Sequence, residues 1–290
     1  MPVLIADRSP TDELVLRIVD ARSGQAVEIA PGRRSPLRVC VHVPGLGGLS
    51  DLRVLVVADV LGRTAELLGG QVFTGLTARG RSEGWWQALA RRASALGIHP
   101  AVAYGDPQEV GEALGGPVDI HVTGPMKREG AGRPADVVDG IRLAVDAESP
   151  PDRSEYTDDP GAAASDSVTA VSDPLAVRLA LLTRAHHTPV DLTPKALAAA
   201  DERLVRWRSA VADWARAPSK PMCADILRQA LTGLEEDLHT PAVLEALSHL
   251  ESQAHIPYGA KFETFVYLDR VLGLDFADEV GRSNSQDPPL

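Results

Sequence analysis

Apolar and polar residues alternate from residue 14 to residue 30, on both sides of the short polar segment RSGQ. This period of two predicts a β-hairpin that turns at Ser23 and Gly24. The next apolar run, LRVCVHV (37–43), is nearly continuous and rich in β-branched residues. Such runs are typical of strands that are buried on both faces of a parallel sheet.

Strand-like and helix-like segments alternate beyond this run. The strand-like segments are 71–77, 99–104 and 118–124, and the helix-like ones are 51–68, 83–97 and 106–116. We expect helix again over 134–145. Strands that alternate with helices in this way predict an α/β fold with a parallel sheet and right-handed crossovers.

From residue 173 onward the pattern is helical. A capping side chain before a proline predicts three helix starts, at Asp173-Pro174, Thr193-Pro194 and Thr240-Pro241. One helix carries an apolar seam with three- and four-residue spacing, formed by Leu197, Ala200, Leu204, Trp207, Val211 and Trp214. A later helix buries Phe262, Phe265 and Val266 and ends at Gly273. The pattern of this half therefore predicts an all-α helix bundle.

The two halves are separated by a change in composition. Residues 147–172 are acidic, small and rich in Pro and Ser, which predicts a flexible linker. We expect an α/β domain over 1–146, the linker over 147–172, a helical bundle domain over 173–278 and a disordered tail over 279–290.

Composition restricts the partners and the compartment. A net charge of −11 argues against a general nucleic-acid coat. The two cysteines, Cys40 and Cys223, lie in apolar segments and are expected to be reduced, buried thiols. We find neither a secretion signal nor a stretch that approaches the about 20 apolar residues of a membrane span. We expect a cytoplasmic protein with no membrane partner.

The Pro/Gly loop 44–50 follows the strand 37–43, at a position where α/β proteins often bind phosphate. The nucleotide-binding candidates of this domain are Gly45, Gly47, Gly48, Ser50, Lys127 and Arg128. Ser50 is the expected N-cap of the next helix, and the Lys127-Arg128 pair follows the strand 118–124. The loop matches neither the dinucleotide fingerprint nor the P-loop, which needs a lysine. A tight strand-to-helix turn explains it at least as well.

A metal site is not expected. Cys40 and His42 lie two residues apart, so on a strand they face the same side. His121 is the other histidine on a predicted strand of this domain. Zinc sites need about four ligands, and incomplete sets seldom bind tightly. A buried core thiol is the better interpretation of Cys40.

The polar clusters of the second half have structural explanations. His186 and His187 are expected at the end of a helix, where an imidazolium favours the dipole. The acidic run 235–237 is expected to be solvated. The candidates for contact with phosphate, on the polar side of the long helix, are Arg203, Arg206 and Arg208, and surface solubility is the default interpretation.

The segments LRIVDARSGQAVEIAP and RVCVHVPGLGGLSDLRVLVVADVLGR resemble the opening of cysteinyl-tRNA synthetases and of mycothiol-pathway cysteine ligases. That opening has a hairpin, a strand with a zinc-ligating Cys, the HIGH loop and a helix of the form ARTYVVFDVLRR. Arg53 and Asp59 fall on the arginine and aspartate of that helix. The segment DPLAVRLALLTRAHH is similar to the family's DP-x-x-x-R-x-x-LL-x-x-HYRS, and LTGLEEDLHTP resembles its DDLNTP helix pair. The resemblance covers residues 14–110 and 171–252 and implies a Rossmann-like, class I synthetase-type sheet followed by a helical bundle.

The departures from this family concern its chemistry. The family's HIGH histidines, which hold ATP phosphates, are replaced by Gly48-Leu49-Ser50-Asp51. The KMSKS loop is expected before Asp173, where the sequence is SDSVTAVS without a lysine. Cys40 matches the first zinc Cys if one residue is deleted, but the partner Cys and the HHENE ligands have no counterpart.

These departures lead to a functional hypothesis. We expect a degenerate synthetase relative that does not activate an amino acid and instead binds a nucleotide, a tRNA or a protein partner. We expect no required cofactor, ATP as a candidate ligand and no zinc. The alternative is an active ATP-dependent cysteine (aminoacyl) ligase whose remodelled site uses Lys127, Arg128 and the glycine loop.

Overall fold

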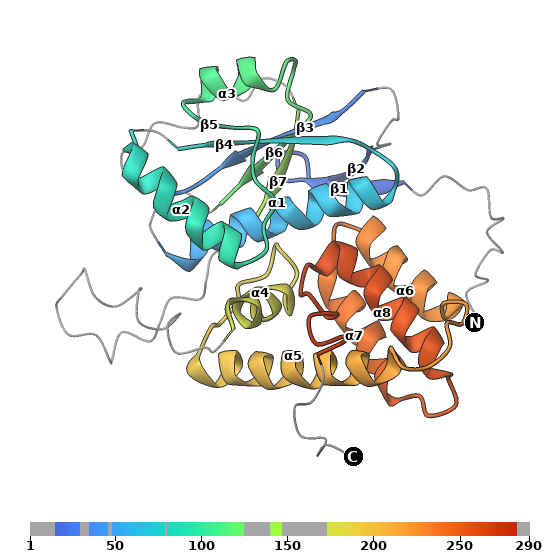
Figure 1. The fold of residues 1–290 in the computed structure, drawn as a ribbon. Coiled ribbons are helices and arrows are strands. Elements are labelled where there is room, and N and C mark those ends of the chain that lie inside the picture. Colours follow the sequence, from blue (N-terminus) through green and yellow to red (C-terminus); the bar gives the residue numbers. More distant parts are fainter. Residues whose placement is uncertain are drawn as a thin grey trace.

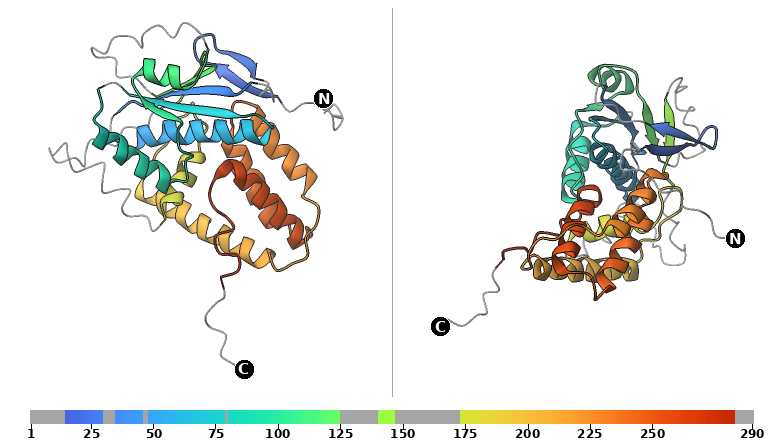
Figure 2. Two further views of the ribbon diagram at one scale, coloured as in Figure 1. Left: turned by 45° about the horizontal axis from the view of Figure 1, so that its top comes forward. Right: turned by 90° about the vertical axis from the view of Figure 1, so that its right-hand side faces the viewer.

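The computed structural model describes residues 15–29, 35–45, 48–78, 80–124, 140–146 and 173–282. These residues form an α/β part and a helical part that pack against each other along one long helix (Figures 1 and 2). The predicted fold class, a Rossmann-like parallel sheet followed by helices, is confirmed. The predicted linker and all but residues 279–282 of the predicted tail lie outside the described residues, and the domain boundaries stay predictions.

The α/β part is built on a five-stranded parallel sheet with the order β5-β4-β3-β6-β7. Its strands are β3 (Leu37–His42), β4 (Val72–Thr77), β5 (Ala103–Gly105), β6 (Ile120–Thr123) and β7 (Ile141–Ala144). Helix α3 (Pro107–Ala113) covers one face. Helix α1 (Leu49–Leu67) covers the other, and α2 (Glu83–Ala95) packs beside α1 (Figure 1).

The predicted hairpin is confirmed as strands β1 (Leu16–Asp20) and β2 (Gln25–Ile29). Gly24 turns the chain with a φ of 69°, a conformation that glycine adopts without a steric penalty. The helix expected over 134–145 is wrong for Ile141–Ala144, which forms β7 at the edge of the sheet, while residues 134–139 lie outside the described residues. The backbone of β7 is held there by β6 and by the hairpin, whose Asp20 carboxylate accepts from the Arg142 N–H.

The helical part consists of five helices in the described chain. They are α4 (Pro174–Leu182), α5 (Pro194–Trp214), α6 (Ala224–Glu235), α7 (Thr240–Ser252) and α8 (Tyr258–Leu272). Asp173 and Thr193 cap α4 and α5 as predicted. Helix α7 begins at Thr240-Pro241 as predicted, but the capping role of Thr240 is wrong: His239 occupies the N-cap, and the Thr240 hydroxyl donates to the Leu182 carbonyl. Gly273 ends α8 in the left-handed conformation.

The predicted apolar seam of α5 is buried along its whole length. Trp207 and Trp214 lie edge-on to Phe265 of α8, with ring centroids 5.7 and 5.1 Å apart. Aromatic pairs in this geometry stabilise a core beyond the burial of their area. The seam therefore fixes α8 across α5.

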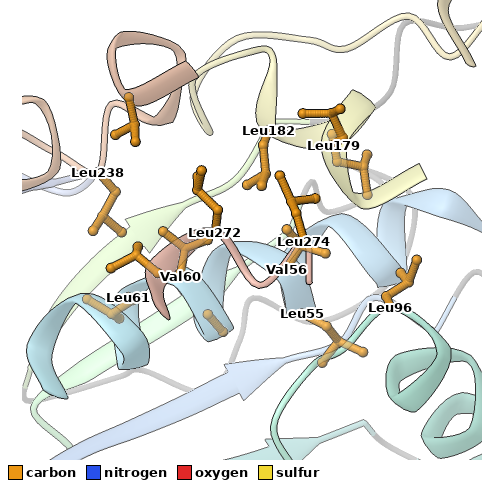
Figure 3. Packing of buried hydrophobic residues seen from close by; sticks show 14 of the residues in the cluster. Leu55, Val56, Val60, Leu61, Leu96, Leu179, Leu182, Leu238, Leu272 and Leu274 are labelled. Carbon is orange, nitrogen blue, oxygen red and sulfur yellow. The ribbon is translucent and has the colours of Figure 1, made fainter. Parts of the chain in front are cut away.

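Helix α1 is buried on nearly all sides, because it lies between the sheet and the helical part. Val56 and Val60 meet Leu179 and Leu182 of α4 and Leu272 of α8 in one apolar cluster (Figure 3). A helix that is buried on nearly all sides is a core element rather than a surface one, and the charged side chains of α1 need partners there. The sheet and the helical part thus share a continuous core in the described chain.

A buried ion pair reinforces this junction. The Arg178 guanidinium, fully buried, donates to the Asp59 carboxylate at 2.5 Å and to the carbonyls of Leu272 and Leu96. Burial alone raises the pKa of the Asp59 carboxyl, but the charges of Arg178 and Arg63 outweigh burial and hold that pKa below its ordinary value. Asp59 is therefore ionised and fully paired at neutral pH.

We expect Asp59→Asn to lower the free energy of unfolding by about 3–5 kcal/mol, because it leaves the Arg178 charge buried without its partner. Urea denaturation followed by circular dichroism measures this change. The control Asp213→Asn removes a solvent-exposed ion pair with Arg216 and should change the stability by less than about 0.5 kcal/mol.

The contribution of Asp59 to the free energy of unfolding should depend on pH with a defined sign. A depressed folded-state pKa gives a stabilisation that is present above the unfolded pKa, about 4, and is lost as the pH falls through the folded value. The difference between wild type and Asp59→Asn should therefore shrink below pH 4. Equal losses in Asp59→Asn and Asp213→Asn at neutral pH would contradict the assigned role of the pair.

Candidate functional site

The best-placed candidate site is the carboxyl edge of the sheet between β3 and β6. The chain runs from β3 outward to β4 and β5, and then returns to the other side of β3 to form β6 and β7. The strand order therefore reverses between β3 and β6. Open parallel sheets bind their ligands outside the carboxyl ends of the strands at such a reversal.

Three potential ligand or acid–base groups share one sheet face at this point. Cys40 and His42 lie on the same side of β3, as predicted, and Cys40 is in register with His121 of β6. The His42 Nε2 and His121 Nδ1 atoms are 2.9 Å apart in a hydrogen bond. The sequence could not show this proximity, since residues 42 and 121 meet only through the strand register.

The Cys40 thiol is buried against Val110 of α3 and Leu114, the residue that follows this helix, as expected for a core thiol. Burial raises its pKa to about 11. The free thiol is therefore protonated at neutral pH, which argues against a role as a nucleophile.

The Thr77 hydroxyl belongs to the same face. Thr77 ends β4 in register with His42, and its side chain is buried. Its oxygen has no hydrogen-bond partner within the described ranges. A buried hydroxyl without a partner is costly, so it marks a position where a ligand or a water molecule fits.

The glycine loop is held by a basic residue that the sequence analysis missed. Gly45 has a φ of 71°, and its carbonyl accepts from the Arg81 Nη2 atom at 2.6 Å. Arg81 also lies over the Trp85 ring at 5.3 Å, and the residue is exposed. The sequence placed Arg81 just after a predicted strand, and this could have identified it as a candidate. The loop after β4 reaches the same edge of the sheet as the loop after β3.

The remaining nucleotide candidates divide into two groups. Gly48 is the N-cap of α1 and Ser50 lies in its first turn, so the expectation that Ser50 is the cap is wrong. Gly47, Lys127 and Arg128 lie outside the described residues. The N-termini of α1 and α2 both follow strands at this edge and direct their positive ends toward it.

The first turns of α1 also hold the sheet and the helical part together. Asp51, in the first turn, is fully buried. Arg53 donates to the carbonyls of Asp146, Ala185 and Thr188, and so ties the helix to the sheet edge and to the loop after α4. Arg53 and Asp59 are the two residues of α1 that match the arginine and aspartate of the related enzymes. Both therefore have structural roles.

The three arginines of α5 are engaged with neighbouring groups. Arg203 stacks over Trp207 at 4.3 Å and donates to the Leu244 carbonyl. Arg206 pairs with Glu251. The expectation that Arg208 is a surface side chain is wrong, because it is buried and donates to Asp173 and to the carbonyls of Leu274 and Asp275.

A second cluster joins His186, His187 and Asp237. His186 lies beyond the end of α4 rather than at its last turn, and its two ring nitrogens face the carbonyls of Ala144 and Asp237. The Asp237 carboxylate accepts from the Val19 N–H of the hairpin. The expectation of a solvated acidic run is wrong for Asp237 and for Glu235, which is 3% exposed.

The fold and the site define a class of protein: a Rossmann-like α/β unit joined to a helical part. No model of a known protein family matches the chain. Part of it is similar to ligases named L-cysteine:1D-myo-inositol 2-amino-2-deoxy-alpha-D-glucopyranoside ligase. The identity is 40% over 75 residues for Streptomyces griseus subsp. griseus, 44% over 78 for Kribbella flavida and 35% over 89 for Acidothermus cellulolyticus.

These segments cover 26%, 27% and 31% of this chain and 17%, 18% and 21% of the relatives. The relatives are mycothiol cysteine ligases of the cysteinyl-tRNA synthetase-like family, so the resemblance is confirmed over about a quarter of the chain. None of the helices in the described ranges is long and apolar enough to cross a membrane.

We expect Cys40 to be inert toward thiol reagents in the native state, because it is buried and its pKa is raised. At pH 7, 5,5′-dithiobis(2-nitrobenzoate) should react with the half-buried Cys223 alone. Cys223→Ser should abolish the reaction and Cys40→Ser should leave it unchanged. The reverse pattern would show that Cys40 is accessible.

Proposed function

We propose that this protein is a relative of the cysteine ligases that keeps their scaffold and binds a phosphate-bearing small molecule, a nucleotide, without activating an amino acid. The observation that carries the proposal is the carboxyl edge between β3 and β6, where the Gly45 loop, Arg81 and two helix N-termini converge. Backbone N–H groups and a guanidinium at a helix N-terminus suit an anionic ligand.

The loss of catalysis is supported by the residues at the start of α1. Gly48, Leu49, Ser50 and Asp51 stand where the related enzymes have HIGH. Groups that stabilise the charge developing on ATP are typically worth several kcal/mol each. This arrangement favours ligand binding over adenylate formation.

A nucleotide is the ligand class we favour over tRNA. The arginines of α5 are already paired or stacked, as described above, and the net charge of −11 opposes a polyanion. Arg81 also donates to a carbonyl and lies over a ring, but it is exposed and stands at the edge where nucleotides bind in sheets of this kind.

We expect no ATP–pyrophosphate exchange above background with cysteine or with any other amino acid of a panel. The measurement uses the full chain and radiolabelled pyrophosphate. Exchange that depends on cysteine would overturn the non-catalytic proposal in favour of an active ligase. Lys127→Ala and Arg128→Ala would then test the alternative site.

For ligand binding, we expect a fluorescent ATP analogue to bind saturably and Arg81→Gln to weaken it about tenfold, as the loss of a charge-assisted hydrogen bond implies. The matched control, Arg228→Gln, changes an exposed arginine of α6 and should have no effect. Equal affinities for wild type and Arg81→Gln would exclude this edge. Salt-sensitive binding of tRNA that weakens in Arg203→Gln and Arg206→Gln would favour tRNA instead.

A further inference from the structure

The cluster of Cys40, His42 and His121 has the geometry of a metal-ligand set. One atom of each side chain, a thiol sulfur and two imidazole nitrogens, lies within 4.8 Å of the other two. Ligands at about 2.0–2.3 Å from a common tetrahedral ion stand about 3.3–3.8 Å apart, and the two imidazole nitrogens, 2.9 Å apart, are already close to that separation.

We propose that β3 and β6 hold a divalent transition-metal ion, zinc by ligand type, through Cys40 Sγ, His42 Nε2 and His121 Nδ1. Sulfur and imidazole nitrogen are the donors that Zn²⁺ takes in proteins. The three ligand side chains lie on two paired strands. Their positions are therefore set by the sheet rather than by a flexible loop. Such a preformed set lowers the ordering cost of binding.

This ligand set differs from the one that the family resemblance implies. The resemblance supplies the Cys40 strand but no second Cys and no HHENE segment. Here the second and third ligands are His42, two residues along β3, and His121, the register partner of Cys40. The sequence offers His121 as a further strand histidine, but only the pairing of β3 with β6 brings it beside Cys40.

Three protein ligands leave a fourth position for water or a bound molecule, as in catalytic zinc sites. The Thr77 hydroxyl, on the same face and in register with His42, is a suitable hydrogen-bond partner for that fourth ligand. The position opens at the carboxyl edge, because His42, Thr77 and Thr123 are the last residues of their strands.

The buried state of Cys40 is compatible with this site. Its thiol is protonated without metal, and a bound cation deprotonates a coordinating thiol outright. The His42–His121 hydrogen bond gives way to two metal–nitrogen bonds when the ion binds. The other cluster, at His186, is a poorer candidate, because both ring nitrogens of His186 already face backbone carbonyls.

The test is titration of the metal-free full chain with Co²⁺, followed by absorption spectroscopy. We expect one equivalent to bind and to give a thiolate-to-cobalt charge-transfer band in the near ultraviolet together with the visible bands of a tetrahedral site. Cys40→Ser should remove the charge-transfer band. His42→Gln and His121→Gln should each weaken Co²⁺ binding about tenfold or more. Loss of a hydrogen-bond partner of a metal ligand already weakens metal affinity by about that factor, and loss of a ligand itself should cost at least as much.

Matched controls separate this site from other thiols and histidines. Cys223→Ser and His255→Gln, which change a half-buried cysteine and an exposed histidine, should leave the spectrum unchanged. Absence of the band in wild type, or its loss in Cys223→Ser but not in Cys40→Ser, would overturn the proposal. The readout is independent of nucleotide binding and of pyrophosphate exchange, so the failure of one proposal is distinguishable from failure of the other.

Discussion

The fold depends on one buried charge, the guanidinium of Arg178. It is fully buried and donates to a carboxylate on α1 and to backbone carbonyls at the ends of α2 and α8. A buried cation is tolerated only when its partners are all in place. Helices α1 and α4 and the ends of α2 and α8 must therefore assemble together. Arg53 imposes the same condition near the start of α1 through three carbonyls.

This constraint explains which parts of the family pattern remain in α1. Arg53 and Asp59 match the family and hold the junction between the sheet and the helices, whereas the HIGH positions at the start of the helix differ. Loss of a junction residue would leave a buried charge without a partner. A change at the helix start alters chemistry but leaves the packing of Val56 and Val60 intact. The proposed loss of catalysis at the helix start is therefore compatible with an intact junction.

The two proposed ligands use neighbouring parts of one edge. His42 ends β3 on the face covered by α3, and the Gly45 loop then leads the chain to α1 on the opposite face. Arg81 reaches this loop from the end of β4. An anion at the loop and a cation beside His42 would also be electrostatically compatible, because opposite charges at short range favour each other.

The sequence by itself determined the elements whose signals are local. Periodicity and capping gave the hairpin, α1, the seam of α5 and the start of α4, because they depend on residues close in the chain. Tertiary structure decided the rest. The edge strand Ile141–Ala144 forms through its pairing with β6. Arg208 is buried, and Asp237 is half-buried, by contacts with segments far away in the chain. The meeting of Cys40, His42 and His121 likewise depends on strand register, which no local pattern encodes.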